Sequence, residues 1–119
     1  MRILVRALER QYELSSECFA RGVKFSKALA RADHYLGELF MDIDQAPQEL
    51  ESDQLDAIGA MLEAQKAIGE TECLTPVMKQ PFIQELRTAI DAIKGKEIGE
   101  ENFQIAERAV TRAQLVEIK

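Results

Sequence analysis

The sequence has little of what strands, disulfide frameworks and most active sites are made of. Its 119 residues include three prolines, six glycines, two cysteines, one histidine and no tryptophan. Strand-favouring residues are few, whereas Ala, Leu, Glu, Gln, Lys and Arg, which favour helices, are abundant. An apolar content of 46% is enough to close one core in a chain of this length. We therefore expect a single all-α domain over residues 1–119.

Long apolar runs are also lacking. The N-terminal stretch MRILVRALER has a run of three apolar residues before Arg6, and no later run approaches the roughly 20 residues of a membrane span. Cys18 and Cys73 form neither a metal-binding spacing nor a disulfide framework. These features predict a cytoplasmic protein with free thiols and no membrane association.

The strongest helical pattern in the chain starts at a pair of serines, Ser15 and Ser16, which are good N-cap residues. A helix over residues 16–44 would be about 43 Å long at 1.5 Å per residue. This length predicts an elongated bundle or a dimer that shares the helix. The apolar positions repeat in steps of three and four, and those expected in the core are Cys18, Phe25, Leu29, Ala32, Leu36, Leu39 or Phe40, and Ile43.

Weaker patterns flank this helix on both sides. We expect a short helix over about residues 2–14, which is either separate from the long one or continuous with it. Pro47 ends or restarts the long helix, and the helical pattern then continues to Gly69.

Two helices are expected in the remainder of the chain. After a loop over residues 70–75, the next helix starts near Pro81, because Thr75-Pro76 and Gln80-Pro81 each resemble a cap followed by a first-turn proline. Its inward residues are Ile83, Leu86, Ile90 and Ile93. The last helix carries Phe103, Ala106, Val110 and Ala113 on its apolar side. The predicted fold is a small helical bundle of about four to five helices with one long central helix.

The one histidine stands among carboxylates. Glu38 and Asp42 follow His34 at successive i+4 spacings, and all three side chains point away from the apolar face of the long helix. A histidine and a carboxylate at this spacing can share a metal ion, but a complete site needs three or four ligands. The sequence also has no glycine-rich phosphate loop and no nucleophile elbow. We predict a surface pair at His34, no catalytic residue, no metal and no cofactor, and hence a protein that is not an enzyme.

Charge is distributed unevenly along the chain. Residues 1–32 carry a net charge of +4, residues 33–72 a net charge of −10, and residues 73–119 a net charge of zero. An ordinary surface can segregate charge without function, and that alternative stays open. The functional interpretation is an acidic helical surface that binds a basic protein, in particular a nucleic-acid-binding protein whose groove it would occupy in place of phosphates. The residues at its centre are Asp42, Asp44, Glu49, Glu51, Asp53 and Asp56.

A basic strip of Arg21, Lys24, Lys27 and Arg31 lies on the same long helix. It supports an alternative function, a nucleic-acid-binding regulator. Direct binding of nucleic acid is disfavoured, because no aromatic residues alternate with these cations and the chain has a net charge of −6. Pairing with the chain's own acidic stretch, or with that of a second copy, is the simpler use of the strip.

A second stripe of small and apolar residues follows another face of the long helix. Its members Phe19, Val23, Ala30 and Met41 are the residues expected to form a dimer interface. A contiguous apolar stripe is rarely left exposed, so it predicts a homodimer. Together these features predict a small non-enzymatic protein-binding module that acts as an adaptor, chaperone or inhibitor.

Overall fold

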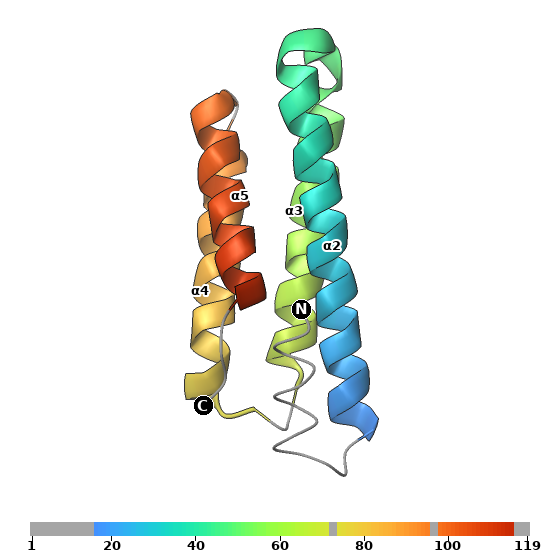
Figure 1. Cartoon of the computed structure of the whole chain (residues 1–119), viewed down its shortest axis with the longest axis vertical. Coiled ribbons are helices and arrows are strands. Elements are labelled where there is room, and N and C mark those ends of the chain that lie inside the picture. The colour runs from blue at the N-terminus through green and yellow to red at the C-terminus, as the bar shows by residue number, and fades with distance from the viewer. Residues whose placement is uncertain (1–15, 72–73, 96–97, 116–119) are drawn as a thin grey trace.

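The computed structural model of the chain is a small all-α bundle (Figure 1). It describes residues 16–71, 74–95 and 98–115, and in the first of these ranges the side chains of residues 16–19 and 21 are left out. Within these ranges the helices are α2 (Ser16–Gln45), α3 (Leu50–Gly69), α4 (Pro76–Ile93) and α5 (Glu100–Leu115), with a 3₁₀ turn η1 (Pro47–Glu49) between α2 and α3. The fold class and the long helix are therefore confirmed. The helix expected over residues 2–14 lies outside the described residues.

The four helices form a closed ring in which each packs on its two neighbours. α2 packs on α3, α3 on α4, α4 on α5, and α5 returns to α2. The molecule measures 48 × 21 × 19 Å, so the bundle is elongated, as the length of α2 predicts. Figure 1 shows that the α2–α3 hairpin extends beyond α4 and α5 at the end where α2 and α3 are joined. No helix in the described part of the chain is both long and apolar enough to cross a membrane.

The core follows the predicted apolar face of α2. Phe25, Leu29, Ala32, Leu36 and Leu39 are almost completely buried there. On α3, which packs on α2, a row of small side chains lets the backbones of the two helices approach closely. The buried residues of this row are Ala57, Ala60, Ala64 and Ala67. The predicted apolar face of the last helix is also confirmed, because Phe103, Ala106, Val110 and Ala113 are buried.

Near the end of α2 the sequence left open whether Leu39 or Phe40 belongs to the core, and the exposed fractions of the two side chains decide it. Leu39 is fully buried, whereas Phe40 is 43% exposed. Phe40 instead stacks on Phe103 at the start of α5, with ring centroids 4.5 Å apart. Stacking of this kind stabilises the contact between the two helices beyond the area that it buries.

The start of α4 differs from the prediction. The helix begins at Pro76, because the Thr75 side chain caps it by accepting a hydrogen bond from the backbone N of Met78 at 3.3 Å. Pro81, where a helix start was expected, lies inside the helix with its ring exposed.

The inward face of α4 differs as well. Its buried residues are Phe82, Leu86, Ala89 and Ile93. The predicted Ile83 and Ile90 are only partly buried, at the margin of the core.

Replacing Pro81 by alanine is expected to stabilise the protein. Proline at this position cannot donate the backbone hydrogen bond that an interior helical residue makes to the carbonyl four residues before it. After allowance for the greater freedom of the unfolded variant chain, we expect the free energy of unfolding to rise by about 1–2 kcal/mol. Urea denaturation measures it. Pro76→Ala is the control, because a first-turn proline breaks no helical hydrogen bond. A Pro81→Ala protein no more stable than this control would contradict the expectation.

Candidate functional site

The predicted acidic residues flank the turn that joins α2 to α3. After Gln45 the backbone N of Ala46 donates to the Asp42 carbonyl at 3.1 Å, and the N of Glu49 donates to the Ala46 carbonyl at 2.9 Å. Pro47 begins the short 3₁₀ turn between these bonds. The chain therefore reverses within a few residues and brings the last turn of α2 beside the first turn of α3.

We call this cluster the acidic end; its members are Asp42, Asp44, Glu49, Glu51, Asp53 and Asp56. Asp44, Glu49, Glu51 and Asp56 are exposed, and Asp42 is half-buried. Asp53, in contrast, is only 6% exposed. The structure thus gathers the predicted residues at one end of the hairpin but places Asp53 beneath the surface.

Asp53 is an unusual group because it is buried among other acids. Burial, a hydrogen bond to the Asp42 side chain, and the charges of Asp42, Glu38 and Glu49 raise the pKa of Asp53 from 3.8 to about 7. Its Oδ2 atom is buried and has no hydrogen-bond partner. Because two carboxylates cannot form a hydrogen bond without a proton, Asp53 is a proton donor to Asp42 in its neutral form.

Glu38 was not included among the predicted acidic residues, although its charge acts on Asp53. Its side chain pairs with His34, whose Nε2 lies 3.2 Å from Glu38 Oε1, and both side chains are exposed. The predicted surface pair is therefore confirmed. Its position four residues before Asp42 on the same helix is the sequence signal that links Glu38 to the acidic end.

Gln54 fixes the acidic end to the rest of the bundle. Its side-chain amide donates to the carbonyl of Ile93 at 2.6 Å and to that of Gly95 at 3.0 Å. Carbonyls at the end of a helix lack partners within the helix, so Gln54 satisfies the one of Ile93 at the end of α4 and a second, that of Gly95, in the turn that follows. No local pattern in the sequence indicates this contact, because the partners are about 40 residues apart.

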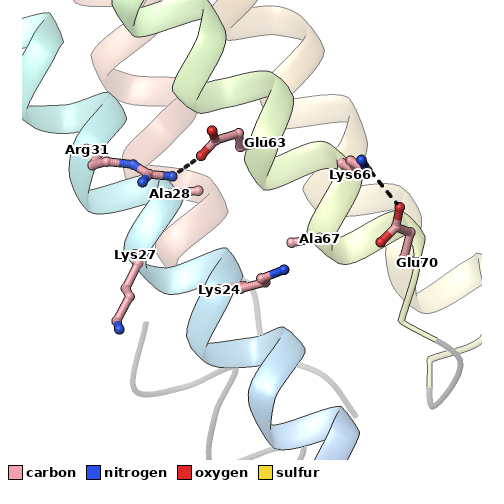
Figure 2. Close-up of a pocket in the computed structure, with 8 residues that line it drawn as sticks. All are labelled: Lys24, Lys27, Ala28, Arg31, Glu63, Lys66, Ala67 and Glu70. Atoms are coloured by element: carbon pink, nitrogen blue, oxygen red, sulfur yellow. Dashed lines mark hydrogen bonds and ion pairs between the residues drawn. The ribbon is translucent and has the colours of Figure 1, made fainter.

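The basic strip borders a hollow between α2 and α3, here called the basic groove (Figure 2). Its volume is about 430 Å³, and Ala28 and Ala67 are among the residues that line it. The charged residues that line it are Lys24, Lys27, Arg31, Lys66, Glu63 and Glu70. Lys66, on α3, was not in the predicted strip, and the Arg21 side chain is outside the described residues.

The acids of the basic groove already have cationic partners. Arg31 forms an ion pair with Glu63 across the groove, and Lys66 Nζ lies 4.0 Å from Glu70 Oε1. In Figure 2 Lys24 points toward α3, whereas Lys27 points away from it. Arg31 thus pairs with the chain's own acidic stretch, as the simpler interpretation of the strip predicts.

A second, shallower hollow continues the basic groove toward the acidic end. It has a volume of about 260 Å³ and shares Arg31 and Glu63 with the basic groove. Its other lining residues are Tyr35, Leu55, Asp56, Gly59 and Ala60. The outer face of the α2–α3 pair therefore changes along its length from the basic groove, through a hollow of mixed polarity, to the acidic end.

The stripe expected to form a dimer interface is only partly apolar surface. Met41 is 57% exposed, Ala30 is exposed and Val23 is half-buried. The Phe19 side chain lies outside the described residues. Its role as a dimer interface stays a prediction.

Among the described residues, no three His, Cys, Asp or Glu side chains are grouped so that they could hold a metal ion. No protein family model matches the chain, and neither does any curated protein or solved structure.

Proposed function

We propose that this protein is a non-enzymatic protein-binding module, acting as an adaptor, chaperone or inhibitor, and that its acidic end binds a basic protein surface. One observation carries the proposal. Six carboxyl groups from α2, η1 and α3 lie around a single turn, and none of them has an ion pair with a lysine or arginine in the described part of the chain.

Electrostatics explains why a basic partner fits. Like charges held together repel one another and lower the stability of the folded state, and a basic surface placed against them removes this cost. Burial is the largest cause of the raised pKa of Asp53, and the charges of Asp42, Glu38 and Glu49 raise it further, as repulsion among these acids requires. A field of this kind steers a basic partner and accelerates association.

The class of partner that fits best is a nucleic-acid-binding protein. Carboxylates on a helical surface resemble the phosphate charges that such a protein binds, so the acidic end can compete for its basic groove. The acidic end itself repels nucleic acid. The basic groove attracts phosphates less strongly than its four cations alone would, because the carboxylates of Glu63 and Glu70 also line it.

The test measures association with poly-L-lysine by stopped-flow fluorescence at low and high salt. Replacing Asp44 and Glu49 by lysine should slow association at low salt by at least about tenfold, because it reverses charge where the partner lands. The control replaces Asp91 and Glu107 by lysine, an equal change in net charge on α4 and α5. This control should slow association by less than about twofold.

The proposal fails if both double variants bind poly-L-lysine at the same rate. That result would mean that net charge alone governs association and that the acidic end is an ordinary solvated surface. Circular dichroism of both variants should remain helical, since all four residues are exposed.

A further inference from the structure

We propose that the outer face of the α2–α3 pair binds a second copy of this chain in an antiparallel arrangement, with the basic groove of each copy against the acidic end of the other. The proposal rests on the proposed function in one respect, because the acidic end is one of its two contact surfaces. It adds a specific basic partner and assigns a role to the basic groove.

The face is polarised in the same sense on both helices. On α2 the sign changes from Lys27 to Asp42, and on α3, which runs the opposite way, it changes from Glu51 to Lys66. On each helix the two residues of opposite sign are 15 positions apart, which corresponds to about 22 Å along the helix axis. The basic groove, which Glu63 and Glu70 line together with its four cations, therefore stands at one end of this face and the acidic end at the other, with the second hollow between them.

Such a face is self-complementary. A two-fold symmetric contact requires that a patch fit a copy of itself, so that each contact occurs twice. Turning the second copy end over end places Lys24 and Lys27 of one copy opposite Glu51 and Asp56 of the other, and the reverse. The parallel arrangement would instead place like charges together, which opposes it.

The middle of the face is an open hollow near the symmetry axis. Tyr35 and Gly59 line it, and Leu55, which is 63% exposed, borders it toward the acidic end. Tyr35 is half-buried, and a Cβ atom placed on Gly59 would meet nothing within 4 Å. The hollow leaves room for the same segment of a second copy, and an exposed apolar side chain such as Leu55 can be buried in that contact.

The other apolar feature of α2 fits a second copy less well. In the stripe of Val23, Ala30 and Met41, the exposed residue Ala30 is small, and so is Gly37 on the same side of the helix. Met41 is the one large exposed side chain among these three, and it borders neither of the two hollows.

The experiment exchanges charges between the two ends of the face. One variant carries Lys24→Glu with Lys27→Glu, and the other carries Glu51→Lys with Asp56→Lys; all four residues are exposed. Analytical ultracentrifugation at low salt should find the parent chain dimeric and each variant alone monomeric. An equimolar mixture of the two variants should form a heterodimer, because each acidic groove then meets a basic end and each acidic end a basic groove.

Two single substitutions locate the interface. Gly59→Glu should raise the dimer dissociation constant by at least about tenfold, since it places a charged side chain in the hollow at the middle of the face, where an added Cβ atom meets nothing in the single chain. Met41→Glu, on the other stripe of α2, should leave the dissociation constant unchanged. Loss of the dimer with Met41→Glu but not with Gly59→Glu would overturn the proposal in favour of the other stripe.

Other outcomes separate this inference from the proposed function. A monomeric parent chain whose binding of poly-L-lysine still depends on Asp44 and Glu49 would overturn the second-copy proposal and leave the proposed function intact. A dimer that follows the charge-exchange pattern, in a protein that binds poly-L-lysine independently of those residues, would support the second copy alone. Dimerisation unaffected by either double variant would overturn it.

Discussion

Raising the pH from about 4 to about 8 is expected to destabilise this protein, and Asp53 is the cause. Burial and the neighbouring acids raise its pKa in the folded state to about 7, against 3.8 for an ordinary aspartate. The folded protein therefore holds a proton that the unfolded chain releases in this range. The stabilisation is complete below the unfolded pKa and is lost as the pH rises through the folded one. The shift corresponds to about 2–4 kcal/mol of free energy of unfolding.

Asp53→Asn tests this assignment. Asparagine has nearly the same shape, donates a hydrogen bond to Asp42 and carries no charge. We expect the free energy of unfolding of the variant at pH 8 to exceed that of the parent chain by about 2–4 kcal/mol. The difference should shrink toward pH 4. Urea denaturation at a series of pH values measures both proteins.

Asp44→Asn is the matched control, because Asp44 belongs to the acidic end but is exposed. Its pH dependence should follow that of the parent chain. If Asp53→Asn follows the parent chain as well, or is less stable at pH 8, then Asp53 is ionised in the folded protein without cost and our account of the acidic end is wrong.

Phe82→Ala is expected to cost about 3–5 kcal/mol of free energy of unfolding. Phe82 is fully buried on α4, and its ring meets that of Phe25 on α2 edge to face, with centroids 5.2 Å apart. These two helices are not neighbours in the ring of the bundle, so this aromatic pair joins its opposite corners. Removing the ring leaves a cavity that the surrounding close-packed core fills only in part.

Thermal and urea denaturation measure the loss. Val77→Ala, at an exposed position in the first turn of the same helix, should change the free energy of unfolding by less than about 0.5 kcal/mol. A Phe82→Ala protein as stable as Val77→Ala would mean that the aromatic pair does not connect α4 to α2 in the way described.

The regular spacing of apolar residues predicted those parts of the fold that the sequence of a single helix determines. The face of α2 from Phe25 to Leu39 follows directly from steps of three and four residues. Apolar spacing does not choose the start of α4 between the two prolines, but the residues before them differ, because Thr75 is a preferred N-cap residue and Gln80 is not. The Thr75 cap decided between them, and a proline inside the helix was tolerated because its ring faces solvent.

The acidic end was likewise predicted only in part. Its residues were predicted from charge along the chain, but the burial of Asp53 was not. A signal was present, since Asp53 precedes Ala57 by four residues and Ala60 by seven and so shares their inward face. Two contacts depend on how the helices pack, and no local sequence pattern indicates them. They are the approach of Lys66 to the basic strip and the hydrogen bond from Gln54 to the Ile93 carbonyl of α4.

The central claim is that the acidic end binds a basic protein, and the most direct measurement is affinity capture from cells that make this protein. Three immobilised baits are compared at low and high salt: the parent chain, the Asp44→Lys, Glu49→Lys variant, and the Asp91→Lys, Glu107→Lys control. We predict that the parent and the control retain the same basic protein at low salt, that high salt releases it, and that the acidic-end variant does not retain it. Equal retention of the same partner by all three baits, unaffected by salt, would contradict the claim.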